Sequence, residues 1–179
     1  MRIVSLICLM PIVIAAAAEP PLAPARVCEV FEDLQAYSGK TALVLGRFSY
    51  RGQGRFLSEK TCETKMAATA AVPATASPRA LRIVIDTKTG PKAPDKLAVD
   101  SPLLDQKLAL VKKSTALASF RFGSTDYDRW AVVYGRVEVE PQQPENAAPK
   151  GGAKSEFEAP ARLVCKGEAL IIFIADRGD

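Results

Sequence analysis

Two stretches of the sequence, TALVLGRFSY at residues 41–50 and WAVVYGRVEV at residues 130–139, repeat one pattern about ninety residues apart. Both contain the core A-[LV]-V-x-G-R, and both are rich in residues that favour strands. A glycine inside a strand usually marks a bulge or a sharp bend, which a tightly curved barrel strand needs. We therefore expect both stretches to be strands of one barrel that meet similar geometry. Two sets of residues alternate onto one face of these strands: Ala42, Val44, Gly46, Phe48 and Tyr50, and Ala131, Val133, Gly135, Val137 and Val139.

The rest of the chain predicts further elements in a definite order. VCEVFEDLQAY has apolar residues at helical spacing and is followed by Ser38-Gly39, which ends a helix. RGQG at residues 51–54 predicts a hairpin turn, and Ser101-Pro102 predicts an N-cap followed by proline at the first helical position. The expected elements are a helix at 27–37, strands at 41–50, 55–58 and 81–86, a helix at 102–118, and strands at 129–140 and within 161–174.

This order indicates the fold class. Five strands with a helix between the third and the fourth have the connectivity of the OB-fold, a small and partly open Greek-key barrel. Its first and fourth strands are neighbours, which places the two repeated stretches side by side. We predict a mainly β protein with two helices, consisting of a five-stranded OB-like Greek-key barrel with an N-terminal helix and a second helix between strands 3 and 4.

The chain begins with the features of a secretory signal. MRIVSLICLMPIVIAAAA joins one arginine to a short apolar run and four alanines, and we expect cleavage after about Ala18. The apolar run is too short for a membrane-spanning helix, and no later segment is long enough. We expect export to the periplasm or the extracellular space. The predicted organisation is a signal peptide at 1–18, a disordered linker at 19–25 and a single domain at 26–179 with loops at 63–79 and 141–160.

Three cysteines remain after removal of the signal peptide: Cys28, Cys62 and Cys165. In an oxidising compartment this odd count predicts one disulfide and one remaining thiol. We pair Cys28 with Cys62 because each stands beside the end of a predicted element, whereas Cys165 falls inside a strand-like apolar run. The residues alone leave the other two pairings open.

The run VCEVFEDLQAYSGKTALVLGRFSY, followed by RFLSEKTC, has a pattern of its own. It resembles the amino-terminal part of a group of small exported bacterial proteins of unknown function. In that group a cysteine-bearing helix, a Y-x-G-K turn, a G-R strand and a second cysteine after an aromatic-L-S segment recur. The resemblance covers about the first quarter of the mature chain well, and the remainder only in strand order. It implies the pairing of Cys28 with Cys62 and implies no activity.

The composition excludes many kinds of active site. The chain has no histidine, which removes His-based triads, His metal sites and the commonest general base. It has no C-x-x-C motif and no P-loop, and RGQGRF lacks the third glycine of a dinucleotide-binding loop. The mature net charge of about +3 is spread along the chain and does not require nucleic acid or an anionic membrane. We expect no cofactor and no metal ion.

Arginine and aromatic side chains are the candidate binding residues. Arg47 and Arg136 follow the strand glycines, and two guanidiniums on neighbouring strands suit a carboxylate or a phosphate. The simpler alternative is that both are solvated residues that pair with nearby glutamates. Aromatic and basic residues also interleave at 48–56 and 120–130, and aromatics near strands two and three of an OB barrel stack sugars or single strands. The candidate ligand-binding set is Arg47, Tyr50, Arg51, Arg55, Phe56, Trp130 and Arg136.

Three hypotheses of function follow. The leading one is a non-enzymatic OB-like module that binds an envelope protein or a glycan through the hairpin and the surface near Arg47 and Arg136. The second is a hydrolytic enzyme that uses Ser, Asp or Glu, for example Asp126 or Asp128. The third is an oligosaccharide or oligonucleotide binder whose ligand changes the fluorescence of Trp130, although export makes nucleic acid a poor partner.

Overall fold

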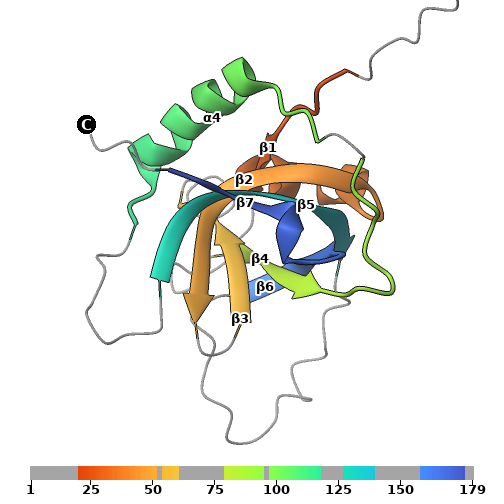
Figure 1. Ribbon diagram of the computed structural model, residues 1–179. Helices are drawn as coiled ribbons and strands as arrows, with labels where there is room; N and C mark the ends of the chain where they lie inside the picture. Colours follow the sequence, from red (N-terminus) through yellow and green to blue (C-terminus); the bar gives the residue numbers. More distant parts are fainter. Residues whose placement is uncertain are drawn as a thin grey trace, which may run out of the picture.

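The computed structural model describes residues 20–51, 54–60, 79–94, 97–117, 127–139 and 158–175. The predicted signal peptide, Cys62, Asp126 and most of the predicted loops at 63–79 and 141–160 lie outside the described residues. The fold is mainly β, with a closed barrel beside a few helices (Figure 1).

Five strands close the barrel. They are β2 (Thr41–Arg51), β3 (Gly54–Ser58), β4 (Arg79–Ile85), β6 (Glu158–Cys165) and β5 (Tyr127–Val139), in the order in which each pairs with the next. β5 then pairs with β2 and completes the barrel. The pair β4 and β6 is parallel, and the other four barrel pairs are antiparallel. The structure confirms the predicted barrel, and it confirms that the first and fourth barrel strands, β2 and β5, are neighbours.

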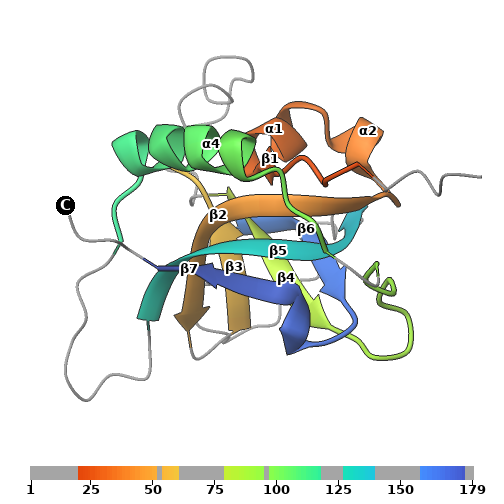
Figure 2. The same ribbon diagram turned by 45° about the horizontal axis from the view of Figure 1, so that its top comes forward.

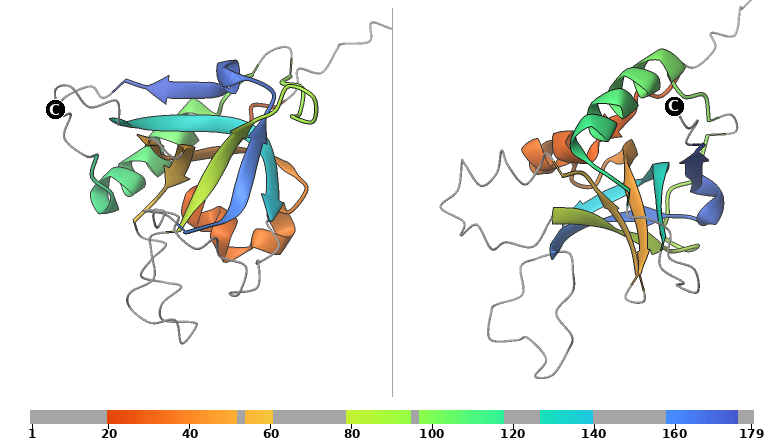
Figure 3. Two further views of the ribbon diagram at one scale, coloured as in Figure 1. Left: turned by 90° about the horizontal axis from the view of Figure 1, so that it is seen from below. Right: turned by 90° about the vertical axis from the view of Figure 1, so that its left-hand side faces the viewer.

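Two short strands and the helices lie outside the barrel. β1 (Ala25–Arg26) pairs in parallel with β2, and β7 (Ile171–Ile174) pairs in an antiparallel way with residues 130–133 of β5. The helices are α1 (Val27–Glu32), α2 (Leu34–Tyr37), α4 (Ser101–Ser114) and the 3₁₀ helix η2 (Glu168–Leu170). Figure 2 shows α4 lying across β2 and β5, with α1 and α2 beside it, and Figure 3 shows β7 alongside β5 at the outside of the barrel.

The repeated stretches are direct partners. β2 and β5 pair from Thr41 opposite Arg136 to Tyr50 opposite Tyr127. In each strand the glycine lies where one edge changes its partner. The edge of β2 pairs with β1 before Gly46 and with β3 after it, while the edge of β5 pairs with β7 before Gly135 and with β6 after it. The repeat therefore reflects a shared geometry. Each of the two strands bends at its glycine, where one of its edges changes from one partner strand to another.

The glycines are needed for space rather than for backbone freedom, since neither has a positive φ. A Cβ on Gly135 would lie 2.8 Å from the carbonyl oxygen of Val164 and 2.9 Å from a side-chain carbon of Leu163. A Cβ on Gly46 would lie 2.8 Å from a methyl group of Val27 and 3.0 Å from the carbonyl oxygen of Ser58. Each glycine lets the next barrel strand approach closely at the bend.

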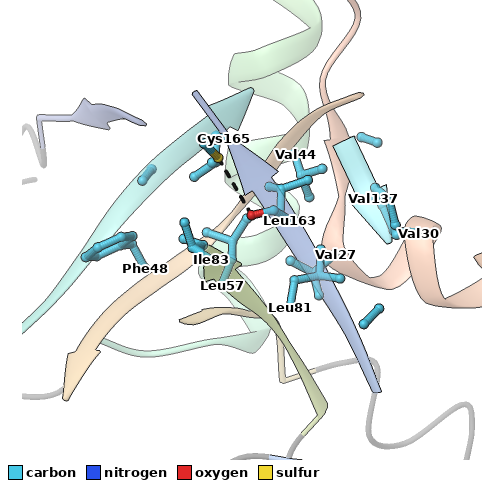
Figure 4. Packing of buried hydrophobic residues seen from close by; sticks show 14 of the residues in the cluster. Val27, Val30, Val44, Phe48, Leu57, Leu81, Ile83, Val137, Leu163 and Cys165 are labelled. Carbon is cyan, nitrogen blue, oxygen red and sulfur yellow. Dashed lines mark hydrogen bonds between the residues drawn. The ribbon is translucent and has the colours of Figure 1, made fainter. Parts of the chain in front are cut away.

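The two faces of the β2–β5 pair are buried in different cores. The predicted set, including Val44, Phe48 and Val133, packs inside the barrel together with residues of α1, β4 and β6 (Figure 4). The opposite face is buried as well, because α4 covers it with Leu108 and Val111. The second core contains Leu43, Leu45, Leu108, Val111, Trp130 and Val132.

Both expected helices differ from the prediction in their bounds. The helix expected at 27–37 is broken at Asp33, whose side chain accepts a hydrogen bond from the backbone N–H of Ala36 and so caps a new helix. The helix expected at 102–118 is shorter at its end, because Thr115 is already extended. Its N-cap is Asp100 rather than Ser101, since the Asp100 carboxylate accepts from the N–H of Leu103.

Two other expectations are also corrected. The segment 161–174 forms two strands instead of one, because the chain turns at Lys166-Gly167 and passes through η2 before β7. The predicted disordered linker is ordered from residue 20 onward among the described residues. Leu22 donates to the carbonyl oxygen of Ala98 at 2.7 Å and accepts from Asp100 at 3.1 Å, which ties the incoming chain to the start of α4.

The space around Gly135 gives a test of this packing. We expect Gly135→Ala to lower the free energy of unfolding by about 1–3 kcal/mol, because the strand β6 must move away from the new methyl group. Gly167→Ala is the matched control, since its φ is extended and its Cβ would meet nothing within 4 Å, and we expect a change within about 0.5 kcal/mol. Chemical denaturation measures both, and equal stability of the two variants would contradict the proposed role of Gly135.

Candidate functional site

One end of the β2–β5 pair carries a group of aromatic and arginine side chains. We call Tyr50, Arg55, Tyr127, Arg129 and Phe173 the aromatic–arginine surface. Tyr50 of β2 lies opposite Arg55 of β3 on one side and Tyr127 of β5 on the other. Arg129 follows Tyr127 on the same face of β5, and β7 places Phe173 opposite Ala131. Four strands therefore meet in this one surface.

The rings and guanidiniums stack on one another. Tyr50 and Tyr127 are stacked with their ring centroids 5.6 Å apart, and the guanidinium of Arg55 lies 5.7 Å from the Tyr50 ring. Arg129 lies 5.7 Å from the ring of Tyr127 and 5.4 Å from the ring of Phe173. Such contacts hold the side chains in place at a modest energy of about 0.5–1 kcal/mol each.

This surface is partly open to solvent and has a buried support. Tyr127 is 37% exposed and Phe173 is 41% exposed. Phe48, which is buried in the barrel, contacts both Tyr127 and Phe173 from below. The exposed rings are therefore fixed to the core of the barrel and present an apolar, cation-flanked surface to solvent.

Arg51 has a structural role next to this surface. Its Nη2 donates to the Asp128 carboxylate at 2.8 Å, and its Nη1 donates to the carbonyl oxygens of Tyr50 and Tyr127. The Asp128 side chain is fully buried. The ion pair ties the end of β2 to β5, and it commits the Asp128 carboxylate, a candidate of the hydrolase hypothesis, to a structural contact.

The candidate residues do not form a single site. Phe56 and Trp130 are 4% and 3% exposed, so neither ring is open to a ligand in this conformation, and Trp130 packs in the core beneath α4. Arg47 and Arg136 are not neighbours either. Arg47 pairs with Trp130 in the register and Arg136 pairs with Thr41, which separates the two arginines by six positions, or about 20 Å along the strands. The structure does not bring them together to hold one ligand.

Arg136 pairs with a nearby glutamate, which was the simpler alternative. Its guanidinium donates to Glu138 Oε1 at 2.7 Å and 3.0 Å, and Arg162 of β6 donates to Glu138 Oε2. The hydrogen bond from Arg136 is the main cause that lowers the pKa of Glu138 below its ordinary value. Arg47 has no such partner among the described residues and lines a separate cavity with Ser58 and Thr115.

The aromatic–arginine surface was predicted from the sequence in part. Tyr50 and Arg55 belong to the candidate set, and Tyr127 and Arg129 lie in the interleaved run at 120–130. Phe173 was missed, because it belongs to β7, which the sequence did not separate from the preceding strand. Its only signal was the short apolar run IIFI, which begins four positions after Gly167.

Comparison with models of protein families, with curated proteins and with solved structures found no match. Within the described ranges no three Cys, Asp or Glu side chains gather in a way that could hold a metal ion. The helices in the described part of the chain include none that is long and apolar enough to cross a membrane. The class of protein therefore rests on its own strand order: an OB-like β-barrel with two added strands and an aromatic–arginine surface.

Cys165 is a free and fully buried thiol in β6. Its sulfur lies 3.8 Å from the carbonyl oxygen of Leu163 (Figure 4). Burial raises the pKa of the thiol from 9.0 to about 12. Since the thiolate is the reactive form, Cys165 is an inert part of the core and not a nucleophile.

This gives a prediction about thiol reactivity. At pH 8 we expect iodoacetamide to leave Cys165 unmodified in the folded protein and to modify it in denaturant, because the folded protein holds the thiol protonated and covered. The free energy of unfolding should also fall as the pH rises above about 9, where the unfolded thiol loses its proton first. Mass spectrometry of the Cys165 peptide measures the modification, and rapid labelling of the folded protein would contradict the burial.

Proposed function

We propose that this protein is an exported, non-enzymatic OB-like binding module, and that it binds an envelope protein or a glycan at the aromatic–arginine surface. The observation that carries the proposal is the exposure of Tyr127 and Phe173 on a rigid support, with Arg129 between them. Tyrosine and arginine are the residue types that contribute most to binding at interfaces. Aromatic faces also stack on sugar rings in OB barrels.

The side chains of the aromatic–arginine surface are already ordered before a partner binds, which favours binding. Each aromatic ring is already held by stacking or by edge contact with its neighbours. Side chains that are ordered before binding lose less conformational entropy when a partner arrives. Arg55 is paired with the exposed Glu168 at 2.6 Å, a weak surface ion pair that a carboxylate of a partner can replace.

The export part of the proposal rests on the sequence of residues 1–18 and includes the disulfide between Cys28 and Cys62. Contacts of Glu59 support this pairing. Glu59 follows β3, and its Oε2 accepts a hydrogen bond from the backbone N–H of Cys28 at 3.2 Å, while its Oε1 binds Arg26. Cys62 follows Glu59 by three positions in the sequence, a separation that an extended chain spans in about 10 Å. A disulfide needs a separation of about 6 Å between the two Cα atoms, and this short stretch of chain is compatible with that requirement.

Substitutions on the surface test the binding proposal. We expect Arg129→Gln and Phe173→Ala each to weaken capture of the partner from an envelope extract at least about tenfold, because both remove an exposed contact. Arg82→Gln and Leu110→Ala are the matched controls, since Arg82 is an exposed strand arginine and Leu110 is an exposed apolar residue of α4. The same variants are tested on a glycan array.

Equal capture by Arg129→Gln, Phe173→Ala and the two controls would overturn the assignment of the surface. Far-ultraviolet circular dichroism of every variant shows whether the barrel has formed. Arg129→Gln is the decisive variant if Phe173→Ala fails to fold, because the Arg129 side chain lies above the rings and not in the core.

Peptide mapping under non-reducing conditions tests the disulfide. We expect one fragment that joins Cys28 to Cys62, and similar losses of about 2–5 kcal/mol in the free energy of unfolding for Cys28→Ser and Cys62→Ser. The double variant should be no less stable than either single one, because both changes remove the same bond. A fragment that joins Cys165 to either cysteine would disprove the pairing.

A further inference from the structure

A polar cavity lies on the other face of β2, away from the aromatic–arginine surface. Its volume is about 270 Å³, and it is lined by Arg47, Ser58, Glu59, Lys60, Thr115 and Ala116. Arg47 in the middle of β2, the end of β3 and the two residues after β3 form one wall, and the two residues that follow α4 form the other. Arg47 points away from the barrel core because Phe48, its neighbour in the strand, points into that core.

The charges on the cavity wall are unbalanced. Arg47 makes no ion pair with any residue in the described part of the chain, and its guanidinium donates only to Ser58 Oγ at 3.3 Å and to the carbonyl oxygen of Ala116 at 3.2 Å. Lys60 adds a second cation at the exposed rim. The carboxylate of Glu59 is buried and has its own cation, Arg26, at 3.1 Å. Because Glu59 is already paired with Arg26, the wall carries two further positive charges, those of Arg47 and Lys60.

Two hydroxyl groups lie on the wall, and that of Ser58 can donate to a ligand. Ser58 and Thr115 are each 3% exposed. Ser58 Oγ accepts from Arg47 Nε, and Thr115 Oγ1 accepts from the backbone N–H of Lys60 at 2.8 Å. The Ser58 oxygen is used as an acceptor in its bond with Arg47, which leaves its proton for an acceptor inside the cavity, whereas the Thr115 hydroxyl also lies 3.4 Å from Ser114 Oγ and is held within the wall.

We propose that this cavity binds one oxyanion group of a small molecule, either a phosphate or a carboxylate. A guanidinium with free N–H groups, an ammonium group and the Ser58 hydroxyl around one cavity have the chemistry that both groups require. The second cation is Lys60 of the chain after β3 and not Arg136, which is committed to Glu138. This inference does not depend on the proposed function, because the cavity and the aromatic–arginine surface lie on opposite faces of β2.

The chain contains a built-in probe for this cavity. Trp130 is its only tryptophan and lies directly opposite Arg47 in the pairing of β2 with β5. Directly opposite side chains on an antiparallel pair are about 5 Å apart at their Cβ atoms. The ring is 3% exposed, so its emission responds to a change in the charge beside it and not to stacking with a ligand.

The experiment titrates the full mature chain with potassium phosphate and, separately, with sodium malonate, while potassium chloride keeps the ionic strength constant. We expect a saturable change in Trp130 emission with at least one of the two anions, and the anion that saturates shows which group the cavity selects. Arg47→Gln should raise the Kd at least about tenfold, because it removes a charge-assisted hydrogen bond. Arg82→Gln, the matched control, should leave the Kd unchanged.

Two results would overturn the proposal. One is the absence of a saturable change with both anions, and the other is an unchanged Kd in a folded Arg47→Gln variant. If Arg47→Gln does not fold, Lys60→Gln decides the question, since Lys60 is exposed and its side chain is not part of the core. An unchanged Kd in Lys60→Gln would then reject the site, and a Kd raised several-fold would support it.

Discussion

The antiparallel pairing of β2 with β5 organises the whole molecule. It closes the barrel, and both of its faces are buried, one against the barrel interior and the other against α4. Each strand must also exchange one edge partner for another halfway along its length. The two glycines make this possible, because any side chain at these positions would meet the backbone or the side chains of the next strand. The added strands β1 and β7 occupy the edges that this exchange leaves open.

Ion pairs join the helices that cover the barrel, and others join neighbouring barrel strands. Glu29 on α1 binds Lys107 on α4 at 2.7 Å and Arg26 at 3.2 Å, so one carboxylate links the two helices that cover the sheet. Burial of Glu29 alone would raise its pKa, but the hydrogen bonds from Lys107 and Arg26 lower it overall. Arg51 with Asp128 links β2 to β5 in the same way, and Arg162 with Glu138 links β6 to β5. Arg47 and Arg129 are different, because neither makes an ion pair in the described part of the chain.

The alternation of side chains between the two faces of a strand explains why Arg47 and Arg129 belong to separate sites. Adjacent residues in a strand point to opposite faces, so the same strand pair presents aromatic rings toward one side and the Arg47 cavity toward the other. A one-residue shift in the register of either strand would exchange the two faces of that strand. The pairing that stabilises the barrel therefore also fixes the position of both candidate binding groups.

The sequence by itself determined the barrel, since strand periodicity, the glycine of each repeat and the order of the elements are local features of the chain. It also indicated Arg47 as a binding candidate, because a guanidinium after the strand glycine suits an anion, and Tyr50 and Arg55, because aromatic and basic residues interleave in the hairpin. Only the tertiary structure decided which candidates share a surface. The register separates Arg47 from Arg136, α4 buries Trp130, and β7 brings Phe173 from the end of the chain to Tyr127. Those outcomes depend on contacts between residues far apart in the chain, which no local pattern encodes.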